Sequence, residues 1–218
     1  RLRNRTQRTT KGFVPFVVFS CTEANPMTDL KTRVVNILTK PSDEWPRIAA
    51  ETTDSTTLTT GYIAPLAAIT PAATFVGISI IGISTFLGTT FRVGIVHGVA
   101  TAVVQFLLAI AGVHVAAIVV DKLAPQFKSQ PSSIQALKLV AYASTAAWVA
   151  GIANVLPQLG PLGFLAGLYS IYLMYLGMTP MMKTPDDQVF PYMVVSAVAV
   201  IGLMLVAVAL AGTLTAAF

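Results

Sequence analysis

The fold of this chain is decided by an apolar stretch that includes GYIAPLAAITPAATFVGISIIGIS (residues 61–84) and VGIVHGVATAVVQFLLAIAGVHVAAIVV (residues 93–120) and continues to Phe218. From Gly61 onward only eight of 158 residues are Asp, Glu, Lys or Arg. Water cannot solvate a folded domain with so little charge, whereas a helix of roughly 20 mostly apolar residues crosses a bilayer core about 30 Å thick. The stretch therefore predicts a polytopic membrane domain.

The few charges fall at breaks that divide this stretch into five apolar segments. We therefore expect an all-α fold with five transmembrane helices, at about residues 61–84, 93–120, 139–156, 162–179 and 190–217. Pro65 and Pro71 lie inside the first predicted span and predict a kink, since neighbouring helices can satisfy the carbonyl groups that a proline frees.

The overall composition excludes several classes of protein. Hydrophobic residues make up 55% and charged residues 11% of the chain, whereas charged residues are near 25% in soluble domains. The net charge of +5 does not indicate nucleic-acid binding, because nine of the fourteen Lys and Arg residues precede residue 60. Basic residues beside a membrane domain report topology or anionic lipid. A single cysteine, Cys21, excludes an intrachain disulfide and a multi-cysteine metal site, and we expect no metal or cofactor.

The distribution of Lys and Arg predicts the orientation. With a cytoplasmic N-terminus, thirteen of these residues lie on the inner side and only Arg92 lies on the outer side. The positive-inside rule therefore predicts an N-terminus in the cytoplasm and a C-terminus outside.

The residues before the apolar stretch divide into two parts. Residues 1–26 are interpreted as an upstream or non-family extension, with translation starting at Met27. In residues 27–60, a cytoplasmic segment and linker, apolar side chains recur at helical spacing and predict an amphipathic helix. Its expected contact surface for lipid or a partner protein comprises Leu30, Val34, Leu38 and Trp45. A helix packed on another segment of the protein explains the pattern equally well.

A polar stripe is the candidate site inside the membrane. His97, Thr101 and Gln105 share one face of the second predicted span. They could form a path for protons, ions or small solutes, or they could form hydrogen bonds to neighbouring helices. The second interpretation is favoured, because no intramembrane Asp, Glu, Lys or Arg accompanies them. No arrangement typical of an enzyme is present, so we expect no catalysis.

Glycines at small-xxx-small spacing predict close helix packing. Gly94 and Gly98 form one such pair, and Gly163 and Gly167 form another. Such pairs allow backbones to approach each other and are compatible with a homo-oligomer.

A set of motifs occurs in order along the chain. The first span begins Gly-Tyr-Ile-Ala-Pro, and the fourth segment contains Tyr-x-x-Tyr-Leu-x-Tyr-Leu-Gly and is followed by Met-Lys-x-Pro. The motif residues are Tyr62, Pro65, Tyr169, Tyr172, Tyr175, Gly177, Lys183 and Pro185. In their order and spacing these motifs resemble the Yip family, the Ypt/Rab-interacting integral membrane proteins.

The resemblance implies an all-helical protein with five spans. Eukaryotic members act in vesicle transport and bind Rab GTPases through their cytoplasmic side. The short cytoplasmic segment here looks like that of a bacterial member, which implies a multi-pass protein of the bacterial inner membrane. We expect a non-catalytic scaffold or adaptor, in contact with lipid and with a protein partner on the cytoplasmic face. The alternative is a permeation protein that uses the polar stripe.

Overall fold

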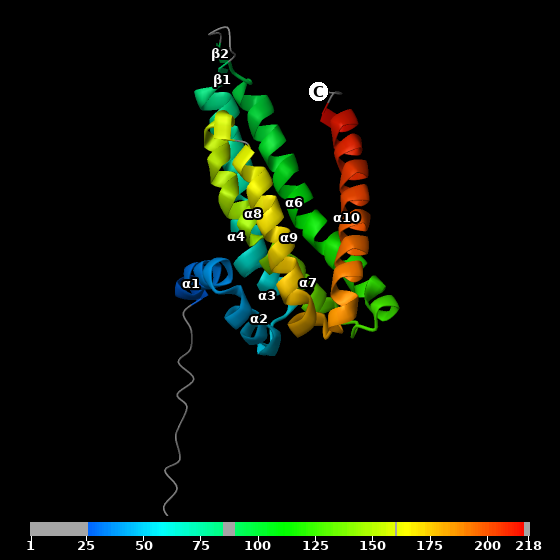
Figure 1. Cartoon of the computed structure of the whole chain (residues 1–218). Coiled ribbons are helices and arrows are strands. Elements are labelled where there is room, and N and C mark those ends of the chain that lie inside the picture. Colours follow the sequence, from blue (N-terminus) through cyan, green and yellow to red (C-terminus); the bar gives the residue numbers. More distant parts are fainter. Residues whose placement is uncertain (1–25, 85–89, 160, 216–218) are drawn as a thin grey trace, which may run out of the picture.

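The structure is a computed structural model that describes residues 26–84, 90–159 and 161–215. Long helices run side by side, and two short helices, α1 (Pro26–Thr39) and α2 (Pro41–Ala50), lie across one end of them (Figure 1). We call this end the α1–α2 face. It also carries the connection between α6 (Ile95–Leu123) and α7 (Ser133–Ala143) and the connection between α9 (Pro161–Met182) and α10 (Asp186–Thr215). The interpretation of Cys21 and the rest of residues 1–25 lies outside the described residues.

The first span is helical but not uniformly α-helical. It consists of α3 (Ser55–Leu58), the π-helix η1 (Thr59–Ile63), α4 (Ala64–Ala67), α5 (Ile69–Phe75) and the π-helix η2 (Val76–Ile81). The helical path breaks at Ala68, between Pro65 and Pro71, so the predicted irregularity is present. Each proline removes a backbone donor that a regular α-helix would use.

The expected linker before the first span is shorter than predicted, because the helix begins at Ser55 rather than at Gly61. Asp54 caps this helix: its carboxylate accepts hydrogen bonds from the backbone N–H groups of Thr56 and Thr57, both at 3.0 Å. A side-chain cap lets the helix start inside a polar, threonine-rich sequence.

At the end opposite to α1 and α2, the chain reverses in a minimal hairpin. Strand β1 (Ile83–Ser84) pairs antiparallel with β2 (Thr90–Phe91), with Ile83 opposite Phe91. Arg92 follows β2, and its Nε lies 3.4 Å from the carbonyl oxygen of Ile81. Strand β2, which Arg92 follows, lies at the end opposite to α1 and α2 (Figure 1).

The middle of the chain forms two spans. The first is α6 (Ile95–Leu123), continued by the 3₁₀-helix η3 (Ala124–Phe127). The second comprises α7 (Ser133–Ala143), α8 (Thr145–Ala150) and the 3₁₀-helix η4 (Gly151–Val155), and a further 3₁₀ turn, η5 (Pro157–Leu159), follows. The predicted start of this span at residue 139 is wrong, because the helix begins at Ser133 and includes Lys138, which was expected in the flanking loop.

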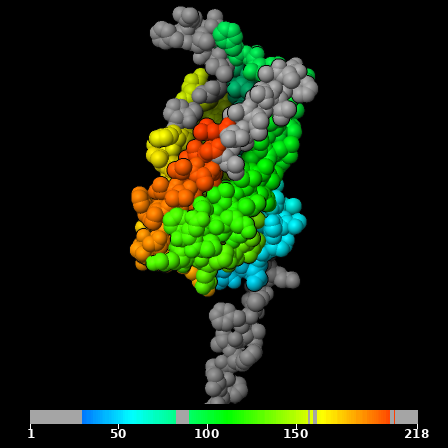
Figure 2. All heavy atoms as spheres, turned by 90° about the vertical axis from the view of Figure 1, so that its right-hand side faces the viewer, coloured from blue at the N-terminus to red at the C-terminus, as the bar shows by residue number. Residues whose placement is uncertain are grey.

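The last two long helices are α9 (Pro161–Met182) and α10 (Asp186–Thr215). The start of α10 is fixed to the end of α6: the Tyr192 hydroxyl donates to the Val120 carbonyl, and the Tyr192 ring stacks on Phe127 at a centroid distance of 4.9 Å. Figure 2 shows this end of α10, in orange, packed against the green α6–α7 region.

Four helical stretches among the described residues are long and apolar enough to cross a membrane: Ser55–Ile81, Ile95–Phe127, Ser133–Val155 and Leu162–Met182. The prediction of an all-helical membrane domain is thus confirmed for four spans.

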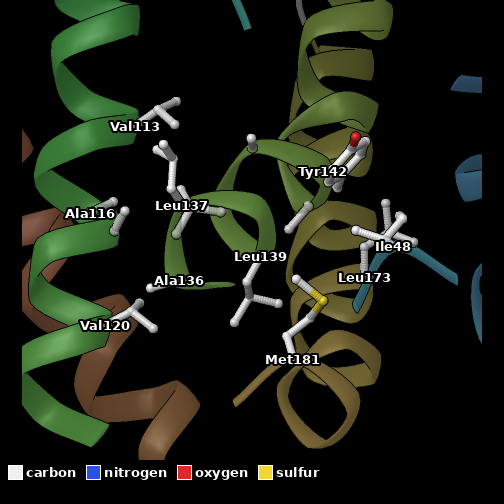
Figure 3. Packing of buried hydrophobic residues seen from close by; sticks show 14 of the residues in the cluster. Ile48, Val113, Ala116, Val120, Ala136, Leu137, Leu139, Tyr142, Leu173 and Met181 are labelled. Carbon is white, nitrogen blue, oxygen red and sulfur yellow. The ribbon is translucent and has the colours of Figure 1, made fainter. Parts of the chain in front are cut away.

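The core lies around α7, which is packed between α6 and α9. Figure 3 shows Leu137 directed toward Val113 and Ala116 of α6, and Leu139 on the side of Met181 of α9. Leu139 is fully buried, and Ala136 and Ala141 on the same helix are also fully buried. Residues 136–143 are all buried.

Close packing through glycine is confirmed at some sites and not at others. A Cβ on Gly98 would collide with the Ser79 hydroxyl of the first span. At Gly94, Gly163 and Gly167, an added Cβ would meet nothing within 4 Å. The predicted Gly163 and Gly167 pair therefore has no packing role among the described residues.

Candidate functional site at the α1–α2 face

Helices α1 and α2 are part of the folded core. Ile37 of α1 and Ile48 of α2 are fully buried, and Trp45 is 1% exposed. Leu30, Val34 and Leu38 are partly buried against the same core. Of the two interpretations of this amphipathic segment, packing on another part of the protein is the one that the structure confirms.

The expectation that Trp45 contacts lipid or a partner protein is wrong, because its side chain is buried inside the protein. Its ring packs edge-on against Tyr142 of α7, at a centroid distance of 6.4 Å, and lies over Gly177 of α9. A Cβ at Gly177 would come within 2.8 Å of the indole atoms Cε2 and Cζ2. The glycine of the Tyr-Leu-Gly motif therefore leaves the space that the indole ring occupies. Because this space is available, the Trp45 ring packs inside the protein.

A buried arginine joins the two short helices. Arg33 of α1 contacts Glu44 of α2 through Nη1, at 2.6 Å from Oε1, and contacts Glu51 through Nη2. The side chains of Arg33 and Glu44 are only 11% and 4% exposed. Burial alone would lower the pKa of Arg33, but the hydrogen bond and negative charge of Glu51 outweigh it and raise that pKa. Arg33 therefore stays charged and holds α1 to α2.

A buried lysine joins α2 to the membrane domain. Lys138 of α7 is 2% exposed, and its Nζ donates to the carbonyl oxygens of Ile48, at 3.0 Å, and Glu51. The neighbouring Gln135 donates from Nε2 to the Ala49 carbonyl at 3.1 Å. The last carbonyls of a helix lack intrahelical partners and carry partial negative charge, so an ammonium group is well suited to cap them.

Arg33, Glu44, Glu51 and Lys138 are here named the latch. Their formal charges sum to zero, and each cation is hydrogen-bonded. A buried charge is tolerated only when it is paired or hydrogen-bonded, and this arrangement meets that condition. The latch therefore fixes α1 and α2 in one position on the membrane domain.

Two tyrosines of the family-like motifs support the same arrangement. The Tyr169 hydroxyl donates to the Leu38 carbonyl near the end of α1, at 2.7 Å. The Tyr62 hydroxyl is 2.7 Å from the Thr145 hydroxyl, and the Tyr62 ring lies 4.3 Å from that of Tyr142. These tyrosines hold helices together. In contrast, Tyr172 and Tyr175 are 48% and 44% exposed.

The remaining motif residues shape the end of α9. Lys183 is exposed and adopts a left-handed conformation, with φ of 50°. Thr184 is buried, accepts a hydrogen bond from Ser129 and donates one to the Met178 carbonyl. Pro185 then precedes α10. The motif thus stops α9 and ties the turn to the α6–α7 connection.

The polar stripe does not form a joined site among the described residues. His97 is exposed, and Thr101 and Gln105 are half-buried. None of these three side chains forms a hydrogen bond to another described residue. The histidine that does so is His114, whose Nε2 lies 3.1 Å from the Thr59 hydroxyl and whose Nδ1 lies 2.9 Å from the Ile110 carbonyl.

The latch and the pair formed by Thr59 and His114 were not predicted from the sequence. A signal was present for Lys138, because it is a lone charge at the start of the apolar run LKLVAYA (residues 137–143). A charge inside such a helix requires a partner. No comparable signal existed for Arg33, which looks like one more basic residue of a polar segment.

Comparison with known proteins gives a family. The Yip1 domain matches residues 35–209, a range that begins in α1 and includes most of α10. No match is found among curated proteins, and no solved structure matches the chain. The matched range contains Gly177 with its partner Trp45, and Lys138 with α2. The match over most of the chain and the four apolar helices together place this membrane protein in the Yip1 domain family.

Proposed function

We propose that this protein is a non-catalytic, multi-pass membrane scaffold or adaptor whose α1–α2 face lies in the cytoplasm and binds a partner protein. In this proposal α10 is the fifth span, the C-terminus is outside, and the membrane is the bacterial inner membrane. The observation that carries the proposal is the latch, which fixes α1 and α2 as one pre-formed unit across one end of the long helices.

The positions of the cations support the orientation. Lys122 is exposed in the last turn of α6, and Lys128 and Lys183 are exposed in the two connections at the α1–α2 face, whereas Arg92 follows β2 in sequence. Cytoplasmic segments near spans are rich in Lys and Arg. The fifth span is supported by α10 itself, a 30-residue helix that has no charged residue after Asp187.

The rigidity of the face supports a binding role. Binding costs conformational entropy when loops or side chains must be ordered, so a surface that is ordered beforehand binds more tightly. Here Lys138 and Gln135 fix the end of α2 through hydrogen bonds to its carbonyl groups. The Tyr169 hydroxyl donates a hydrogen bond to the Leu38 carbonyl near the end of α1. Because the latch side chains are engaged in structural hydrogen bonds, they are suited to holding a surface rather than to turnover.

Site-specific photo-crosslinking in native membranes tests the proposal. A photoreactive amino acid is placed at Val35, Lys40 or Lys128, which are exposed at the α1–α2 face, and at the exposed Phe91 of the opposite end as the control. We expect one discrete crosslinked protein from the face and none from position 91. If face and control positions give the same crosslinks, or none at all, the proposal fails.

A further inference from the structure

The polar stripe of α6 brings hydrogen-bonding groups to a part of the helix surface that is not covered. Gln105 and Thr101 are half-buried and His97 is exposed, and their side chains form no hydrogen bond with any other part of the chain that the structure describes. The hydrocarbon core of a membrane supplies neither donors nor acceptors, so a polar group left there without a partner costs free energy. These side chains therefore require a partner from outside the described residues.

Gln105 is the residue of the stripe that lies within the hydrocarbon core. Asp121 is the first charged residue at the α1–α2 end of α6 and marks the membrane boundary there. Gln105 is 16 positions before it, which is about 24 Å along a helix that rises about 1.5 Å per residue. The core is about 30 Å thick. Thr101 lies one turn farther out, and His97, about 36 Å from Asp121, lies near the opposite boundary.

There is room beside this part of α6. A hollow of about 500 Å³ lies at the start of the helix and is lined by Gly94, Ile95, Val96, His97 and Ala100. A Cβ added at Gly94 would meet nothing within 4 Å. Figure 1 shows α10 separating from α6 toward the end that carries β1 and β2. A second helix can therefore approach α6 along the stripe.

The face that carries Gln105 has the chemistry of a helix–helix interface in a membrane. Thr101 is four residues before Gln105, and Gly112 is seven residues after it, so all three lie on one face of the helix. Glycine lets two backbones approach closely, and Gln, Thr and His side chains form hydrogen bonds across such interfaces. A glutamine amide both donates and accepts, so two of these amides can satisfy each other.

We propose that the polar stripe joins two copies of this chain in a parallel dimer, with α6 packed against α6. Copies with the same topology hold each residue at the same depth, and a two-fold axis along the membrane normal brings identical residues together. The amide N–H of Gln105 in each copy then donates to the amide oxygen of the same residue in the other copy. The inference goes beyond the proposed function, which concerns the α1–α2 face.

Self-complementarity selects a second copy over other occupants of this face. Lipid acyl chains carry no hydrogen-bonding group, so they leave the Gln105 amide without a partner. A different membrane protein would need a polar group at the matching depth of its own helix. A second copy supplies this group by symmetry, together with a second Gly112 for close approach.

Disulfide crosslinking in native membranes tests the interface. In a Cys21→Ser background, Thr101→Cys places the only thiol on the stripe. Leu107→Cys is the control, because Leu107 is 59% exposed and follows Gln105 by two residues, which places it on nearly the opposite side of the helix. After oxidation with copper phenanthroline, we expect a disulfide-linked dimer from Thr101→Cys and little from Leu107→Cys. No dimer from Thr101→Cys, or equal amounts from both, would overturn the inference.

The contribution of the amide is measured by energy transfer between dye-labelled copies in vesicles, over a range of protein-to-lipid ratios. Gln105→Leu should raise the dissociation constant of the dimer by about 3- to 30-fold, since hydrogen bonds between helices are lost. Val103→Leu, at a 52% exposed position off the stripe, should leave it unchanged. Equal changes in the two variants would contradict the specific role of Gln105.

Two further outcomes would also refute the dimer. At a dilution where the protein is monomeric, Gln105→Leu should melt at the wild-type temperature, and a lower melting temperature would mean that the amide bonds within its own chain. A disulfide from Thr101→Cys to a different protein would show that the partner is not a second copy. Crosslinks from Val35, Lys40 and Lys128 test the α1–α2 face separately, so either idea can fail while the other stands.

Discussion

Replacing Lys138 with methionine should release α1 and α2 from the membrane domain. Methionine keeps the unbranched apolar stem but removes the ammonium group that caps the Ile48 and Glu51 carbonyls. The substitution leaves those two carbonyls without the hydrogen bonds that Lys138 donates. A hydrogen bond from a charged group contributes about 1.5–3 kcal/mol. At about 1.4 kcal/mol per factor of ten, the population of the released state should rise by roughly 10- to 150-fold.

Cysteine accessibility measures this release. Ile37 of α1 is fully buried, so Ile37→Cys in a Cys21→Ser background should react with a maleimide only when α1 opens. When opening is fast and reversible, the labelling rate follows the population of the open state. Labelling should be slow in the parent and much faster with Lys138→Met, while Lys122→Met, at an exposed position, serves as the control. If Lys138→Met leaves the labelling rate unchanged, the latch does not hold these helices.

Three other predictions follow from the packing and charge of particular residues. Gly177→Ala should lower thermal stability by about 1–3 kcal/mol, since its Cβ would overlap Trp45, whereas Gly163→Ala, with nothing within 4 Å, should change the melting temperature little. The hydroxyl and N–H groups of Thr57 hold the pKa of Asp54 below its usual range, so its cap stabilises the fold above that range. This contribution is lost as the pH falls through the lowered pKa, and a melting-temperature difference between wild type and Asp54→Asn should shrink on acidification below about pH 4. In reconstituted vesicles, His97→Ala and Gln105→Leu should leave ion flux at the wild-type level. Flux that depends on either residue would favour the permeation alternative.

The membrane class and the spans could be predicted because the constraint is local. The hydrocarbon core requires about 20 apolar residues for each crossing, and a run such as residues 93–120 shows this directly. Boundaries failed where a helix starts among polar residues. One helix begins at Ser55 because Asp54 caps it, and another begins at Ser133 within a polar sequence.

The site was harder to predict because its parts are distant in sequence. Arg33 and Glu51 are 18 residues apart, and Lys138 bonds to Ile48 across 90 residues. The amphipathic pattern of residues 30–38 correctly indicates a helix with one buried face, but it does not say whether lipid or protein covers that face. The burial of Trp45 depends on Gly177, which leaves room for its ring and is distant in sequence. The residues around Trp45 therefore do not predict its burial.

Hydrogen–deuterium exchange of the full-length protein in nanodiscs tests the central claim most directly. If α1 and α2 are fixed to the membrane domain, the amides of residues 33–38 and 45–50 should be protected to a degree close to that of α7. Fast exchange of these amides, together with slow exchange in α7, would show that the two helices move freely at the membrane surface and would contradict the account.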